Sequence, residues 1–184
     1  MTAPHEMPIA GAAQGIAADI AGRVPVLRTK RLTLRAPRLE DFAAYAAIAC
    51  GPRADTIDGP MTRDAAWDDF MRMVGLWILR GHGVWTVEAK GRIAGFALIG
   101  FEPGDQEPEL GYFTADGLEG QGIATEAARA VLEHAFGALG LNRLVSYIHP
   151  GNAASIAVAR RLGAVQDGVV DGSQVWVHLA GGAA

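Results

Sequence analysis

The chain has 184 residues, of which 50% are hydrophobic and 20% are charged. This composition can bury a sizeable core and the length is typical of one domain, so a wholly disordered chain is excluded. The formal net charge of −4 gives no reason to expect nucleic acid or an anionic membrane as a partner. Cys50 is the only cysteine, which excludes an intramolecular disulfide and favours a reducing, cytoplasmic location. No apolar run approaches the ~20 residues of a membrane span, and no secretory signal is visible.

The N-terminal segment differs in composition from the rest of the chain. It is rich in Ala, Gly and Pro and lacks a sustained period, which is typical of a loose or weakly helical segment. Ile9, Ile16 and Ile20 can form one apolar stripe, so a short docked helix is the alternative. We therefore expect an extension over residues 1–25 and one domain over residues 26–184.

The domain is predicted to begin with a strand and a helix. Leu27, Leu32 and Leu34 alternate with polar residues as in a strand, which Pro37 ends. Glu40-Asp41 then opens a helix, because acidic residues favour a first helical turn. The residues predicted to point inward are Phe42, Tyr45 and Ile48.

A second helix follows, with Thr62 as its predicted N-cap and its end near Gly81. Its apolar residues at helical spacing are Trp67, Phe70, Met71, Val74, Trp77 and Ile78.

The second half of the chain alternates strands and helices. In chain order, it predicts strands at 84–87 and 93–99 with a tight turn at Lys90-Gly91, a strand at 110–114, a helix at 125–139, a strand at 144–148, a helix at 153–162 and a strand pair within 169–179. The order β-α-α-β-β-β-α-β-α-β-β predicts a single α/β (α+β) domain, in which helices flank a mixed, mostly antiparallel central sheet.

A glycine-rich turn, Gly120 to Thr125, leads from a predicted strand into a predicted helix. The first N–H groups of a helix have no internal partners, and glycines leave them accessible, so such a turn favours an anion. The lysine of a P-loop is absent, and the dinucleotide pattern fits Gly120 and Gly122 but fails at Thr125. On this segment alone, a plain connection is an equally good interpretation, and a nucleotide-binding domain is a weaker one.

Five segments in order resemble the GCN5-related N-acetyltransferase (GNAT) superfamily, in particular its RimJ/RimL-like branch. They are Arg28 to Arg35, Asp41, Glu109 to Tyr112, Glu119 to Glu126, and Asn152 to Ser155 with Arg161 to Gly163. The resemblance spans about residues 26–179. It implies a GNAT-like domain that moves an acetyl group from acetyl-CoA to a primary amine by direct attack in a ternary complex.

The resemblance and the chemistry of acyl transfer together indicate which residues form the site, and no metal is expected, because no histidine has metal-ligand spacing and one cysteine excludes a Cys-rich zinc site. The predicted catalytic residues are Glu109, as proton acceptor, and Ser155, as donor to the leaving thiolate. The predicted cofactor-binding residues are Phe113, Thr114, Glu119, Gly120, Gln121, Gly122, Ile123, Ala124, Thr125, Asn152 and Ser155. Three of these residues have a structural alternative: Asn152 as a helix N-cap, Ser155 as an ordinary polar helix residue, and Glu109 as a solvated strand-end acid.

The chain departs from the superfamily pattern at several positions. Glu119 stands where Arg or Gln is usual, so we expect its side chain to point away and its backbone to bind the pyrophosphate. Ala159 stands where many members have a tyrosine that protonates the thiolate. Ala164 and Asp167 replace the usual Phe and Glu.

These departures keep a second hypothesis open, a non-catalytic acyl-CoA-binding module or regulator on the same fold. For the enzyme, the acceptor stays open among protein N-termini, polyamines, amino sugars and amine antibiotics. The sequence also leaves the oligomeric state open, with a homodimer among the options.

Overall fold

The computed structural model describes residues 3–56 and 59–181. The helices are η1 (Pro4–Glu6), α1 (Ala12–Ala21), η2 (Leu39–Asp41), α2 (Phe42–Ala49), η3 (Pro52–Thr56), α3 (Arg63–Arg80), α4 (Ile123–Gly137) and α5 (Ala153–Arg161), where η marks a 3-10 helix. The strands are β1 (Leu27–Arg28), β2 (Leu32–Arg35), β3 (Val84–Ala89), β4 (Arg92–Gly100), β5 (Glu109–Thr114), β6 (Arg143–Ile148), β7 (Val165–Val170) and β8 (Ser173–Leu179).

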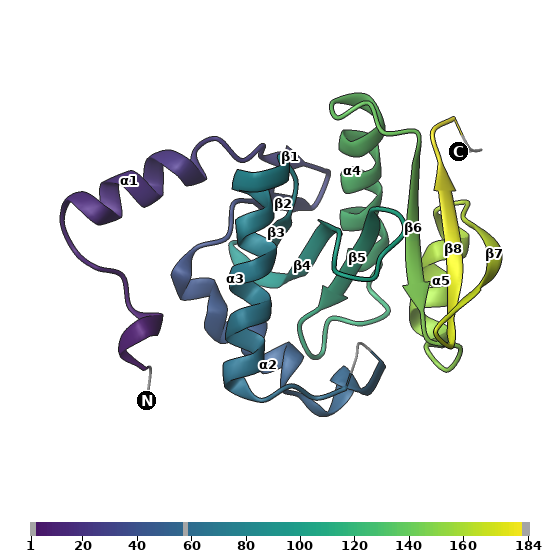
Figure 1. The fold of residues 1–184 in the computed structure, drawn as a ribbon, viewed down its shortest axis with the longest axis horizontal. Coiled ribbons are helices and arrows are strands. Elements are labelled where there is room, and N and C mark those ends of the chain that lie inside the picture. The colour runs from purple at the N-terminus through teal and green to yellow at the C-terminus, as the bar shows by residue number, and fades with distance from the viewer. Residues whose placement is uncertain (1–2, 57–58, 182–184) are drawn as a thin grey trace.

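The described strands form one sheet in the order β1-β2-β3-β4-β5-β6-β8-β7 (Figure 1). Among them, β5 and β6 are the only neighbours that run parallel. The predicted α/β class with a mixed, mostly antiparallel sheet is therefore confirmed. The predicted first strand is instead two antiparallel strands, because Thr29 turns the chain: its backbone N–H donates to the Leu32 carbonyl and its hydroxyl accepts from the Leu32 N–H, at 3.0 and 2.9 Å.

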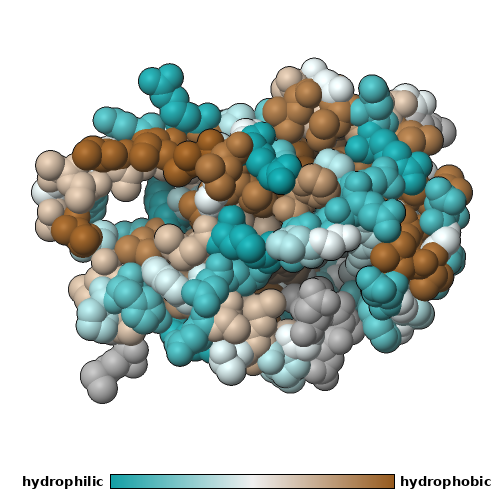
Figure 2. Space-filling model, in the orientation of Figure 1, coloured by the Kyte–Doolittle hydropathy of each residue, from teal (hydrophilic) through white to brown (hydrophobic). Residues whose placement is uncertain are grey.

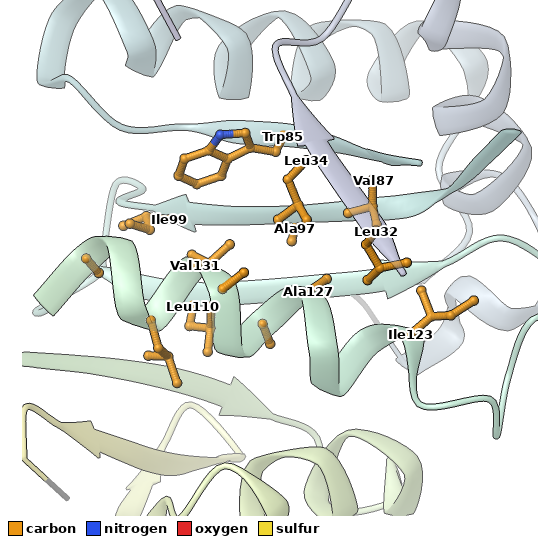
Figure 3. Close-up of a cluster of buried hydrophobic side chains, with 14 of the residues drawn as sticks. Leu32, Leu34, Trp85, Val87, Ala97, Ile99, Leu110, Ile123, Ala127 and Val131 are labelled. Carbon is orange, nitrogen blue, oxygen red and sulfur yellow. The ribbon is translucent and has the colours of Figure 1, made fainter. Parts of the chain in front are cut away.

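Alternating side chains of the central strands enter two different cores. Val84 packs in a cluster with α2 and α3, whereas the next residue, Trp85, packs in a cluster with α4. Figure 3 shows the second cluster, where strand residues such as Leu34 and Val87 face Val131 of α4. The two helical layers therefore cover opposite faces of the sheet, as the period of two in strands requires.

Several local signals of the sequence have the structure they predict. Thr62 caps α3 by accepting a hydrogen bond from the Ala65 N–H at 3.2 Å, and Gly81 ends that helix with a φ of 73°. Lys90 and Gly91 both have positive φ, as the tight turn between β3 and β4 demands.

The buried face of α3 is only partly the predicted one. Of the apolar residues at helical spacing, Phe70 is buried but Met71 and Ile78 are exposed, and Met73 and Leu76 are buried in addition. The helix carries more apolar residues than one face holds, so spacing alone does not decide which of them meet the sheet.

Two elements also begin more than one residue before their predicted start. The helix predicted from Thr125 begins at Ile123, because Gly122 takes the N-cap position with a φ of 76°. The last strand pair begins at Val165 rather than Val169, and most of β7 is exposed at the edge of the sheet, so no alternating pattern marks its start.

The N-terminal segment forms a helix that does not dock. Ile9, Ile16 and Ile20 are 77%, 62% and 47% exposed, and Figure 2 shows hydrophobic side chains along α1 with an opening beneath it. The segment is held at its two ends: Glu6 accepts two bonds from Arg63 at 2.7 and 2.8 Å, and the Pro25 carbonyl accepts one from Trp85 at 2.8 Å. The predicted division into 1–25 and 26–184 stays a prediction, and residues 1–2 and 182–184 lie outside the described part.

Candidate active site

The parallel strands β5 and β6 separate almost as soon as they pair. Within the described residues, Glu109 opposite Val145 is their single register pair, and the Val145 N–H donates to the Pro108 carbonyl at 3.1 Å. Beyond that point, the two strands diverge (Figure 1). We call this region the fork.

Side chains replace the backbone hydrogen bonds that the divergence removes. The Ser146 hydroxyl donates to the Leu110 carbonyl at 2.7 Å, and Glu109 Oε1 accepts from the Tyr147 N–H at 3.3 Å. Backbone polar groups at the fork are thereby paired without a continuous ladder.

A cleft of about 1120 Å³ extends from the fork along β5, the glycine-rich turn and the first turns of α4 and α5. Of the residues predicted to bind the cofactor, those lining it are Phe113, Thr114, Glu119, Gly120, Gly122, Ile123, Ala124, Thr125, Asn152 and Ser155. Gln121 is not among the lining residues: its carbonyl accepts from Arg31 at 2.9 Å, and its amide donates to the Gly117 carbonyl at 3.2 Å. The fold therefore brings segments about 40 residues apart to one cleft.

The glycine-rich turn presents the N-terminus of α4 to this cleft. Gly120 and Gly122 have φ values of 70° and 76°, a conformation that residues with a side chain rarely adopt. Gly122 is the N-cap and has no side chain with which to cap the helix. A helix start of this kind favours an anion through its N–H groups and its dipole.

Glu126 ties the turn to the start of the sheet. Its carboxylate accepts from the Thr29 hydroxyl at 2.5 Å, from the Arg31 N–H at 3.0 Å and from Arg31 Nε at 2.6 Å. Burial acts to raise the pKa of Glu126, but these hydrogen bonds outweigh it and the pKa is lowered. The segments around Thr29 and Glu126, predicted from separate motifs, thus form one anchor for the turn.

The first turn of α5 forms the other side of the cleft. Asn152 Oδ1 caps α5 by accepting from the Ser155 N–H at 3.0 Å, and the Ser155 carbonyl accepts from the Tyr112 hydroxyl at 3.0 Å. Ala159 is fully buried in a cluster with Ile148 and Trp176. Ser155 lies one helical turn before Ala159, and of the two only Ser155 lines the cleft.

Glu109 lies at the fork itself and not among the residues that line the cleft. Its strand neighbours show which way it faces: Leu110 and Tyr112 pack on the α4 side, and Phe113 packs on the α2 and α3 side. By alternation, Glu109 belongs to the α2 and α3 face. The acidic loop before it is largely ion-paired, with Glu102 and Glu107 each bound to an arginine.

Sequence reasoning missed several residues of the cleft. Tyr112 lies within a recognised motif, but its partner, Ser155, is 43 positions away and no local pattern joins them. Three arginines, Arg53, Arg129 and Arg161, also line the cleft, and Arg129 donates to the Arg161 carbonyl at 3.3 Å. An arginine gives no sequence signal that distinguishes a ligand contact from a solvated surface.

A family model described as the acetyltransferase (GNAT) domain matches residues 31–165. The chain belongs to the GNAT acetyltransferase family. Solved structures share this fold. The acetyltransferase from Agrobacterium tumefaciens str. C58 is 36% identical, with a TM-score of 0.82 over 85% of this chain and 95% of that one.

Two further relatives cover similar shares. An uncharacterised N-acetyltransferase named p20, from Bacillus licheniformis, is 28% identical over 78% of this chain and 84% of its own. Mycobacterium smegmatis RimJ, solved in complex with a CoA-disulfide, is 24% identical with a TM-score of 0.66 over 86% of this chain and 87% of that one, a likeness of fold. The GNAT protein described here is thus an acetyl-CoA-dependent N-acetyltransferase.

Two features are absent from the described part of the chain. No described helix is long and apolar enough to cross a bilayer. No group of three or more His, Cys, Asp or Glu side chains in that part of the chain is placed to hold a metal ion.

Proposed function

We propose that this GNAT protein binds acetyl-CoA in the cleft, with its pyrophosphate on the Gly120 to Thr125 turn and its thioester at the fork. The observation that carries this proposal is the coincidence of two features in one cleft. Strands β5 and β6 open beside the N-terminus of α4, which a glycine-rich turn leaves accessible. The first feature suits an extended arm and the second suits an anion.

The pantetheine arm fits the edge that β5 presents to the fork. Phe113 and Thr114 pair with β4 on one side, and β6 has diverged from their other side. Amide groups of the arm can therefore hydrogen-bond to this edge as an added strand does. The proposed pairing holds the acetyl group where β5 and β6 meet.

The two faces of β5 supply different parts of the reaction. The turn and α4 lie on one face, and Glu109 belongs to the other, where α2 and α3 pack. We place the acceptor amine on the Glu109 side, from which it attacks the thioester carbonyl directly. Glu109 accepts the amine proton, directly or through water, since a protonated amine cannot attack.

Ser155 completes the proposal on the cofactor side. It lies in the first turn of α5, whose dipole favours the negative charge that develops on the departing sulfur. Its hydroxyl donates a hydrogen bond to that thiolate. Arg129 and Arg161 line the same cleft, and in this proposal they pair with the 3′-phosphate of the cofactor.

The proposed acceptor is a primary amine, either a protein N-terminus or a small-molecule amine. We extend the proposal to a cytoplasmic location, which rests on the single cysteine of the chain.

A matched pair of variants at Ala124 tests the cofactor site. Ala124 lines the cleft in the first turn of α4, where a glutamate favours the helix. Ala124→Glu places a negative charge in the proposed pyrophosphate site, whereas Ala124→Gln adds the same bulk without charge. Replacing Gly120 or Gly122 would be less informative, because a residue with a side chain would strain the backbone at the positive φ values of these two positions.

Calorimetry with CoA should show that Ala124→Glu binds at least about tenfold more weakly than Ala124→Gln, about 1.4 kcal/mol. Thermal unfolding should show that both variants are folded. Equal CoA affinity of the two variants would remove the pyrophosphate from this turn.

A further inference from the structure

Arg53 reaches across the mouth of the cleft to the glycine-rich turn. It belongs to η3, which comes to the cleft from another part of the chain than the turn. Its Nη1 lies 2.7 Å from Asp116 Oδ1, and the same guanidinium pairs with Glu119. The side chain of Glu119 therefore has a cation supplied by a different element, 66 positions earlier in the chain.

Glu119 poses an electrostatic problem for the proposed site. It directly precedes Gly120 and lines the cleft, so its carboxylate repels a pyrophosphate on the turn. In the free protein, Arg53 pairs with that carboxylate and neutralises its charge. The expectation that the Glu119 side chain points away from the pyrophosphate stays a prediction, and in the free protein its carboxylate is paired with Arg53.

The other glutamate of the cleft is held differently. Glu126 is fixed by Thr29 and Arg31 through bonds of 2.5 to 3.0 Å, and Arg31 also holds the Gln121 carbonyl. That anchor needs no rearrangement when a ligand enters. The Arg53 pair is instead about half exposed on both sides, and exposed ion pairs of this kind contribute little to stability.

We propose that Arg53 binds the pyrophosphate of acetyl-CoA and exchanges partners when the cofactor enters. In the free protein the guanidinium pairs with Glu119 and Asp116, and in the complex it contacts the phosphate oxygens. A guanidinium pairs with phosphate in a bidentate way, whereas its two carboxylate partners in the free protein are about half exposed or more and therefore hold it weakly. This inference rests on the proposed function, because it takes the cleft as the acetyl-CoA site.

The test compares CoA, 3′-dephospho-CoA and pantetheine on the whole protein by calorimetry. Arg53→Gln should weaken binding of CoA and of 3′-dephospho-CoA by about tenfold or more, since both keep the pyrophosphate. Competition between pantetheine and CoA should give the same pantetheine affinity as in the wild type. Arg53→Lys should recover part of the loss, and Arg92→Gln, an exposed arginine at the start of β4, should change nothing.

Glu119→Gln should tighten CoA binding, because it removes the repulsive carboxylate, and it should restore part of the affinity that Arg53→Gln loses. Unchanged CoA affinity in Arg53→Gln overturns the inference. A loss confined to CoA overturns it too, since Arg53 would then contact the 3′-phosphate. An equal loss of pantetheine affinity would also overturn the inference, because it would show that Arg53 maintains the fold of the cleft. Failure of the wild type itself to bind CoA would instead refute the proposed function.

Discussion

Ser155 is held at the cleft by its backbone, which leaves its hydroxyl available for chemistry. Its N–H donates to Asn152 and its carbonyl accepts from Tyr112, so both neighbouring walls of the cleft fix its position. Ala159, one turn later, is buried and cannot donate a proton. The donor to the leaving thiolate is therefore assigned to Ser155 in the proposed mechanism.

Replacing Ser155 with Ala should lower kcat while CoA affinity stays within a few-fold. Loss of one neutral donor costs about 1–3 kcal/mol of transition-state stabilisation, roughly five- to 150-fold in rate. Steady-state kinetics with calorimetry measure both quantities, and Ser173→Ala in β8 is the control. A variant with full kcat and weakened CoA binding would make Ser155 a cofactor contact only.

The candidate site depends on the fork between strands β5 and β6. Where β5 and β6 part, Ser146 and Glu109 supply the hydrogen bonds that a regular parallel ladder would make. Glu109 therefore has two roles in the account. One is to pair with the Tyr147 N–H, and the other is to accept the proton of the amine.

Two substitutions at Glu109 separate those roles. Glu109→Gln keeps an acceptor oxygen for the Tyr147 N–H but loses the base, so kcat should fall by about 100-fold and the acidic limb of the pH–rate profile should flatten. Its CoA affinity should stay at the wild-type value. Glu109→Ala loses both roles, so its CoA affinity should fall as well. A glutamine variant with the full rate and an unaltered profile would leave Glu109 a structural residue.

The elements themselves were largely predictable, and the reason is that their signals are local. The Thr62 cap and the Lys90-Gly91 turn depend on neighbouring residues, and both are present as predicted. The failures involve distant partners. No local pattern indicates that Met71 and Ile78 stay exposed while α1 remains undocked.

The candidate site follows the same division. The turn from Gly120 to Thr125 could be predicted from the sequence, because its glycine-rich motif directly precedes the start of a helix. The contacts of Arg53 with Glu119 and of Tyr112 with Ser155 join segments 66 and 43 positions apart, so only the folded chain places them together.

In the whole molecule, the fork joins the strands β1 to β5 to the strands β6, β8 and β7. His178 of β8 lies buried next to it. Its Nε2 donates to the Ser146 hydroxyl at 3.2 Å, a tautomer assigned because that hydroxyl uses its own hydrogen on Leu110. Among the described residues, its Nδ1 has no hydrogen-bond partner. Burial lowers the pKa of His178 to about 4, because a proton on Nδ1 would be an unpaired buried charge.

His178 should therefore make the molecule sensitive to acid. In the unfolded chain His178 binds a proton below pH 6.5, whereas in the folded chain it does so only near pH 4. The free energy of unfolding therefore falls as the pH is lowered from 6.5 to about 4. The free energy of unfolding of the wild type should drop by about 3 kcal/mol relative to His178→Gln between pH 7 and pH 4. Urea denaturation of both proteins measures this difference. A difference that stays constant with pH would show that His178 titrates normally in the folded state.

The most direct test of the central claim is thiol release from acetyl-CoA in the presence of primary amines. The panel contains peptides with free N-termini, polyamines and amino sugars, with N-acetylated peptides as controls, and the products are identified by mass. We predict that at least one free amine stimulates thiol release, with one acetyl group transferred for each thiol, and that Ala124→Glu loses this activity. If the protein binds CoA but no amine raises thiol release above the level that Ala124→Glu shows, the assignment as an acetyltransferase is contradicted and the chain is an acyl-CoA-binding module.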